Sequence, residues 1–287
     1  MPRPNEVFLS LPDDTPKSST TTINIAGFHV HLYGVSELTP EQAKDTVVLF
    51  HIHGRTRTYK DAEAIGHQLL HQIRQRGGNK KGLVIATFDN RNHGSRTVDN
   101  NAINDWKSGN PRHAQDMLST MDGIVTDVQT VITFLESYVD GIFRPTQFIV
   151  TGLSLGGHAS WDVLARDPRV NAAVIVVGCP DLTAMLLDRL GGYSSTADVP
   201  SGTEKWPKSV ERLYLARDRS LTEIRGKKIL VLNGAEDPLV PSRFTRPWVE
   251  KYAANNDVIF VEQEDTGHWM SYQMMERIED WLQQFLN

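Results

Sequence analysis

Three residues far apart in the chain have the side chains that nucleophilic catalysis requires. Ser154 stands between Gly152 and Gly156, where an apolar run gives way to a helix-like segment. A serine hydroxyl becomes a strong nucleophile only when a base removes its proton and a third group orients that base. His268 is the expected base and Asp237 the expected orienting acid, because both follow predicted strands beyond the serine.

The two glycines around Ser154 have a physical explanation. At a sharp turn from strand to helix, a serine is held in a strained backbone conformation with its hydroxyl projecting outward. Side chains at positions 152 and 156 would collide there with the strand or the helix. The following helix directs its free amide groups and positive dipole end at the serine, which favours the negative charge of acyl transfer. An ordinary helix N-cap, the alternative role for Ser154, does not need both glycines.

Short apolar runs alternate with amphipathic segments along the whole chain. Strands are predicted at residues 23–25, 28–33, 47–52, 83–88, 148–153, 172–177, 228–233 and 258–262. Helices are predicted at residues 59–76, 117–139, 156–166, 242–254 and 271–286. This alternation after an antiparallel start predicts one α/β domain over residues 1–287, with a mostly parallel sheet of eight strands flanked by helices. Such sheets carry their chemistry at the carboxyl ends of the strands.

These motifs resemble the α/β-hydrolase superfamily, and the chain is identified as similar to its serine hydrolase or esterase-like members. The similarity extends from about Ile23 to Leu286. It rests on Gly152-Leu-Ser-Leu-Gly156, Gly234-Ala-Glu-Asp-Pro-Leu-Val-Pro241, Gly267-His268 and His53-Gly54. The stretch Asp89-Asn-Arg-Asn-His-Gly-Ser-Arg96 resembles a further family segment, Asp-x-Arg-x-x-Gly-x-Ser, with its serine one position early.

The resemblance implies further parts of a site. The backbone amides of Leu155 and Arg55 would form the oxyanion hole, and residues 179–225 would form a small helical cap after the sixth strand. The cap would supply apolar walls such as Leu182, Met185, Leu186, Tyr193 and Trp206. The expected substrate pocket includes His53, Arg91, Met185 and Trp269.

Several assignments have competitors in the sequence. Glu236 competes with Asp237 as the acid, although Pro238 and the match to the acid turn favour Asp237. His51 and His53 point the same way on a strand and suggest a metal site, but no convincing set of further ligands accompanies them. We expect His53 instead to hydrogen-bond the backbone and shape the oxyanion loop. Asp89 is expected to stabilise its loop.

Four arginines fall in loops predicted near the site entrance. Any of them that turned inward could pair with a carboxylate on the substrate, while solvated surface arginines are the commoner case. The four are Arg55, Arg57, Arg91 and Arg96.

Composition narrows the remaining possibilities. The formal net charge of −5 gives no basic field for nucleic acid. No stretch approaches the roughly 18 apolar residues of a membrane span. The single cysteine, Cys179, forms no internal disulfide, and residues 1–22 are a polar lead-in without a signal-peptide core. We expect a soluble, cytoplasmic protein.

The expected function is a serine hydrolase that cleaves a small carboxylic ester, thioester or lactone through an acyl-enzyme, without metal or cofactor. A peptidase or a carbon–carbon bond hydrolase on the same fold is the nearest alternative. A member that binds a small ligand without turnover is the alternative from another class.

Overall fold

The computed structural model describes residues 5–7 and 15–287, and its centre is one eight-stranded sheet. The strand order is β1-β2-β4-β3-β5-β6-β7-β8. Strand β2 pairs antiparallel with β1 and β4, and all other pairs are parallel. The strands are β1 (Thr20–Ile25), β2 (Phe28–Tyr33), β3 (Thr46–Ile52), β4 (Gly82–Thr87), β5 (Pro145–Leu153), β6 (Val170–Val176), β7 (Lys228–Gly234) and β8 (Asp257–Gln263). The predicted mostly parallel α/β sheet is confirmed.

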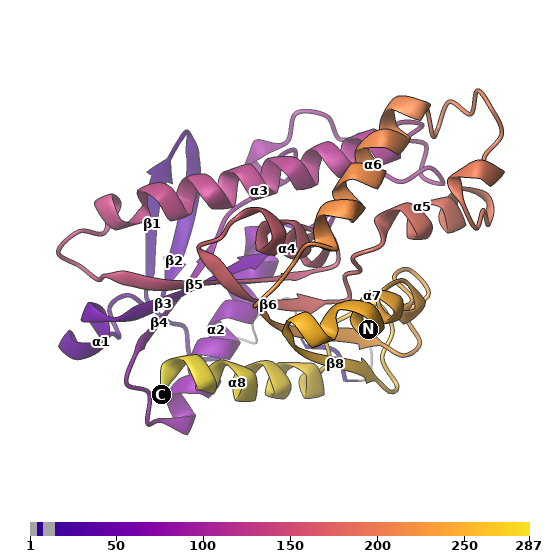
Figure 1. Ribbon diagram of the computed structural model, residues 1–287. Coiled ribbons are helices and arrows are strands. Elements are labelled where there is room, and N and C mark those ends of the chain that lie inside the picture. The colour runs from indigo at the N-terminus through magenta and orange to yellow at the C-terminus, as the bar shows by residue number, and fades with distance from the viewer. Residues whose placement is uncertain (1–4, 8–14) are drawn as a thin grey trace.

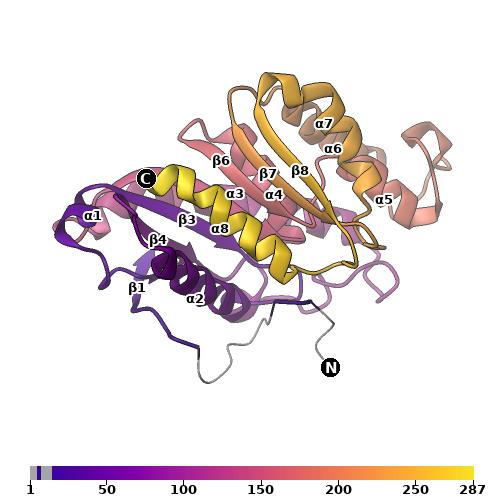
Figure 2. The same ribbon diagram turned by 90° about the horizontal axis from the view of Figure 1, so that it is seen from below.

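Helices cover both faces of this sheet (Figures 1 and 2). Helices α2 (Tyr59–Arg76) and α8 (Tyr272–Leu286) pack on one face, and α3 (His113–Tyr138) and α4 (Leu155–Arg166) pack on the other. The central strands are therefore buried on both sides, which explains their continuous apolar runs. Within the described part of the chain, no helix has the length and apolar character needed to cross a membrane.

Helix boundaries follow local capping chemistry. Helix α2 has the predicted bounds because Thr58 and Asp61 form a capping box at its start. Helix α3 begins four residues before the predicted Met117, at His113. A short helix that the apolar pattern did not predict, α1 (Pro40–Lys44), buries no residue and is capped by Thr39. The predicted helix 242–254 is α7 (Arg246–Tyr252) between the 3₁₀ turns η3 (Ser242–Phe244) and η4 (Ala253–Asn255).

The segment after β6 contains two helices, α5 (Leu182–Gly191) and α6 (Lys208–Leu221), and the 3₁₀ turn η2 (Thr196–Asp198). Both helices lie on the same side of the sheet as α3 and α4 (Figure 1). Arg217 of α6 binds the buried Asp162 of α4 at 2.8 Å, which ties this segment to the main domain. The apolar residues expected to wall a pocket pack instead into the main core: Leu182, Met185, Leu186 and Trp206.

The N-terminal lead-in departs from a wholly solvated tail in its described part. Residues 1–4 and 8–14 of this predicted segment lie outside the described residues. The amide of Val7 donates to the carbonyl of Met270 at 2.8 Å, and the amide of Tyr272 donates to Asn5 at 3.0 Å. Val7 is buried because it packs into the core beside α8, so residues 5–7 add a short backbone pairing to residues 270–272.

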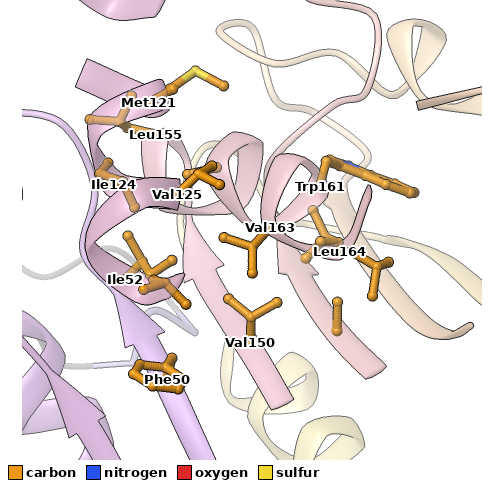
Figure 3. Close-up of a cluster of buried hydrophobic side chains, with 14 of the residues drawn as sticks. Phe50, Ile52, Met121, Ile124, Val125, Val150, Leu155, Trp161, Val163 and Leu164 are labelled. Atoms are coloured by element: carbon orange, nitrogen blue, oxygen red, sulfur yellow. The ribbon is translucent and has the colours of Figure 1, made fainter. Parts of the chain in front are cut away.

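A close-packed cluster holds α4 in place (Figure 3). Trp161 and its neighbours on α4 pack against α3 and the strands β3 and β5. Trp161 is fully buried. Its ring packs edge-on against the ring of Trp248, with 4.6 Å between the ring centroids. Its indole nitrogen has no hydrogen-bond partner among the described residues, so this side chain stabilises the fold by packing alone.

Replacing this side chain tests the packing. We expect Trp161→Ala to lower the free energy of unfolding by about 3–5 kcal/mol, because it leaves a large cavity beneath α4. Urea denaturation followed by circular dichroism measures the loss. Trp161→Phe keeps an aromatic ring, leaves a smaller cavity and loses no hydrogen bond, so its loss should be smaller. Equal losses in the two variants would contradict the packing explanation.

Candidate active site

The turn from β5 into α4 puts Ser154 in an unusual backbone conformation. Its φ of 56° and ψ of −112° lie in a region that side-chain-bearing residues rarely occupy. A Cβ at Gly152 would lie 2.3 Å from the backbone of Gly156, and a Cβ at Gly156 would lie 2.0 Å from the carbonyl oxygen of Ile52. Glycine is therefore required at both positions, and the colliding groups are backbone atoms that cannot rotate away.

Ser154, His268 and Asp237 form a continuous hydrogen-bonded chain. Ser154 Oγ lies 2.8 Å from His268 Nε2, and His268 Nδ1 lies 2.8 Å from Asp237 Oδ2. A carboxylate only accepts hydrogen bonds, so Nδ1–H donates to Asp237 and Nε2 presents its lone pair to the serine hydroxyl. This arrangement can remove the hydroxyl proton.

Backbone contacts position the acid and the base. Asp237 follows β7, and its Oδ1 accepts hydrogen bonds from the amides of Leu239 at 2.8 Å and Val240 at 2.9 Å. The turn after β7 touches the loop that carries His268, since a Cβ at Gly234 would lie 2.3 Å from the carbonyl oxygen of Gly267. Asp237 is buried while its competitor Glu236 is exposed, so the structure brings Asp237 to His268.

The two amides expected to bind an oxyanion belong to adjacent segments. The loop after β3 lies against the turn at Ser154, because a Cβ at Gly54 would be 3.7 Å from the Cβ of Ser154. Within the described residues, the amides of Arg55 and Leu155 donate no hydrogen bond. Both N–H groups are thus available to a ligand.

His53 joins the ends of β3 and β4. Its Nε2 accepts the amide of Asn90 at 2.9 Å, and its Nδ1 lies 2.8 Å from the carbonyl of Gly54. Burial lowers the pKa of His53 to about 4, which keeps this ring neutral. His53 does not line the cavity described below, in contrast to its place in the expected pocket, because its ring is committed to these backbone groups.

The metal alternative finds no support in the geometry. Burial lowers the pKa of His51 to about 4 as well, and no group of three ligating side chains occurs in residues 5–7 and 15–287. Asp89 binds the amides of Tyr59 and Ser95 at 2.9 and 2.8 Å, so it stabilises its loop.

A cavity of about 810 Å³ opens over the hydrogen-bonded chain. Ser154, His268 and Trp269 all line it, as does Arg55. Part of its wall comes from the connection between residues 97 and 112, which contributes Asp105, Trp106 and Lys107 and was not among the predicted pocket residues. The signal available in the sequence was the length of this connection, since long loops in compact domains are commonly functional.

Besides His53, two more of the predicted pocket residues, Arg91 and Met185, lie outside the cavity. Arg91 bonds the buried carboxylate of Asp127 at 2.8 Å, and Arg96 bonds the same carboxylate at 2.7 Å. Neither arginine lines the cavity, because this buried acid holds both. Met185 is fully buried, and its sulfur lies 3.6 Å from that of Cys179 in the core.

One known protein family matches most of the chain. The model of a family described as "Alpha/beta hydrolase family" matches residues 47–281. The chain belongs to this family. The assignment supports a hydrolase and confirms the α/β-hydrolase fold. A search of curated proteins gave no significant match.

Several solved structures are similar to this chain at low sequence identity. TT1662 from Thermus thermophilus has a TM-score of 0.69 at 20% identity, covering 95% of this hydrolase and 99% of TT1662. The Pyrococcus furiosus esterase Pf2001 has a TM-score of 0.59 at 14% identity, and the match covers 100% of this chain and 99% of the esterase. An acylaminoacyl peptidase from Pyrococcus horikoshii has a TM-score of 0.65 at 11% identity, covering 94% of this chain and 42% of the peptidase. These likenesses show the fold.

The neutral His53 makes stability depend on pH. Folding lowers the pKa of His53 from 6.5 to about 4, so the unfolded chain takes up a proton first as the pH falls. The free energy of unfolding should therefore decrease between about pH 6.5 and pH 4, with a contribution from this residue on the order of 1–3 kcal/mol. Urea denaturation at several pH values measures it. His53→Asn should be less stable at neutral pH and should lose less on acidification; an unchanged slope would contradict the assignment.

Proposed function

We propose that this protein is a serine hydrolase that cleaves a carboxylic ester, thioester or lactone of a small molecule through an acyl-enzyme. The observation that carries the proposal is the hydrogen-bonded chain from Ser154 through His268 to Asp237, with 2.8 Å at each step. A protein that only binds a ligand would not require a nucleophile, a base and an acid that are hydrogen-bonded in series. The family assignment supports the coarser part, hydrolysis.

Each residue has one role in the proposed reaction. Ser154 Oγ attacks the substrate carbonyl while His268 Nε2 takes its proton. The resulting imidazolium is stabilised by Asp237 and returns the proton to the leaving alcohol or thiol as the acyl-enzyme forms. A water molecule then attacks the acyl-enzyme, with His268 again as base, and the acid product leaves with Ser154 restored.

The developing oxyanion is assigned to the amides of Leu155 and Arg55. The start of α4 adds its positive dipole end at the same place. Because both donors belong to the backbone, their positions depend on the turn at Ser154 and on the loop that His53 braces. The loss of one such donor typically costs about 3 kcal/mol of transition-state stabilisation.

A peptidase is the second candidate. The observation that favours it is the fold similarity to an acylaminoacyl peptidase, although this chain spans less than half of that protein's length. Amide hydrolysis uses the same nucleophile and base, so turnover of aminoacyl arylamides against nitrophenyl esters decides between the two.

Replacing the nucleophile tests the reaction class. Ser154→Ala should abolish both the turnover of 4-nitrophenyl esters and covalent labelling by a fluorophosphonate probe, because no other hydroxyl faces His268 Nε2 in the described structure. Wild-type protein should show a burst of nitrophenol as the acyl-enzyme accumulates. Labelling that persists in Ser154→Ala would place the nucleophile elsewhere.

Replacing the acid tests the base's orientation. In Asp237→Asn, the amide oxygen is expected to face the amides of Leu239 and Val240, which leaves the NH₂ group toward His268 Nδ1. His268 would then carry its proton on Nε2 and could not accept one from Ser154, so kcat should fall by roughly 10³–10⁴-fold.

Glu236→Gln is the matched control for this prediction. Glu236 is the neighbouring acid and is exposed, so its replacement should change kcat by less than about 3-fold. A larger loss in Glu236→Gln than in Asp237→Asn would reverse the assignment of the acid.

A further inference from the structure

A cation without an acidic partner stands in the wall of the cavity. Arg189 reaches this cavity from α5 and donates a hydrogen bond to the carbonyl oxygen of Leu239. Within residues 5–7 and 15–287, Leu239 is its only bonded acceptor, and no carboxylate forms an ion pair with it. A guanidinium has five N–H donors in a planar fork, so most of its donors remain available.

A second arginine, Arg55, lines the same cavity. Arg55 donates to the carbonyl oxygen of Ile103 at 2.7 Å, and among the described residues its only ion-pair partner, Asp105, is 3.7 Å away. The positive charge of Arg55 is among the effects that lower the pKa of Arg189. Burial is the main effect on both guanidinium groups and lowers the pKa of each, but arginine remains charged in proteins.

The other cationic side chains expected near the entrance are either paired with an acid or exposed to solvent. Arg91 and Arg96 are held by Asp127, as described above. Arg57 lies 3.6 Å from Asp61 and is half exposed. Lys107 lines the cavity but is solvated.

The acids of the cavity wall do not neutralise Arg189 either. They are Glu6, Asp105 and Glu236, and none of them forms an ion pair with Arg189 in the described structure. Asp237 attracts Arg189 at longer range, but its two oxygens are bonded to His268 and to two backbone amides. A partly desolvated positive charge is costly unless an anion accompanies it, so this part of the cavity favours a negatively charged ligand group.

We propose that Arg189, assisted by Arg55, binds a carboxylate group of the substrate, so that the enzyme selects esters, thioesters or lactones that carry a carboxylate. A carboxylate can accept two parallel N–H bonds from one guanidinium. Ser154 and His268 line the same cavity of about 810 Å³, which has room for one small molecule that reaches both places. This inference rests on the proposed hydrolase function and adds the substrate's charge to it.

Two matched pairs of esters test the inference, each compared by kcat/KM after subtraction of the uncatalysed rate. The first pair carries the charge on the acyl chain: mono-4-nitrophenyl glutarate against neutral 4-nitrophenyl pentanoate. The second pair carries it on the alcohol: 3-carboxyphenyl butanoate against 3-carbamoylphenyl butanoate. Wild-type protein should prefer the anionic ester in one pair, which also shows on which side of the scissile bond the carboxylate lies.

The variant Arg189→Met keeps the length of the side chain and removes its charge. We expect it to lower kcat/KM for the preferred anionic ester by about 10–100-fold, the effect of losing a hydrogen bond between charged groups. The neutral partner of that pair should change by less than about 3-fold. Arg189→Lys keeps the charge and should retain an intermediate preference.

Arg243→Met is the control, because Arg243 forms an exposed ion pair at 3.0 Å with Asp188, next to Arg189 in the chain, and does not line the cavity. It should leave both esters unaffected. Fluorophosphonate labelling of each variant shows that the site is folded. Equal turnover of anionic and neutral esters in both pairs, or an equal loss for both in Arg189→Met, would overturn the carboxylate site and leave the hydrolase proposal standing. A wild-type protein that neither turns over any of these esters nor reacts with the probe would overturn the proposed function itself.

Discussion

The arrangement of the site depends on a close approach of backbone segments beneath Ser154. Gly156 lies so near the carbonyl oxygen of Ile52 that no side chain fits between them, and a Cβ at Gly152 would likewise collide with the backbone of Gly156. Because β3, β5 and α4 meet there without intervening side chains, strand β5 can give way to helix α4 at the single residue Ser154. The cost of the positive φ at Ser154 is offset by packing, since Leu155 and Trp161 of the following helix are buried in the larger core (Figure 3).

The other functional side chains are held in a related way. Gly234 lets the turns after β7 and β8 touch, because a Cβ there would collide with the carbonyl oxygens of Thr266 and Gly267, and this contact brings the acid and the base within hydrogen-bonding distance of each other. Asp237 is fixed by two backbone amides, and a neutral His53 connects the loops after β3 and β4. The parallel sheet supplies this convergence, because the carboxyl ends of its parallel strands meet at one edge and the loops that follow them lie together there.

The charge of the cavity differs from that of the whole chain. The formal net charge is −5, yet Arg55 and Arg189 both line the cavity that contains Ser154, and in the described structure Asp105 is the only acid that forms an ion pair with either of them. His113 in the cavity wall is neutral near pH 7 and adds no charge of its own, because burial lowers its pKa to about 4. A ligand's anionic group therefore meets a local field that the overall composition does not indicate.

Local sequence patterns were sufficient for most of the elements, though not for α1, and for the order of the three reactive side chains. Hydrophobic periodicity indicates which face of a segment is buried, so helix α2 was predictable. The spacing of glycines indicates where backbone segments touch, so the turn at Ser154 was predictable. The partners of long charged side chains were not predictable in this way. Arg91 is held by an acid 36 residues away, whereas Arg189 reaches the cavity without one, although both are ordinary arginines in the sequence. Only the tertiary structure decides this, because an ion pair depends on which distant segments pack together.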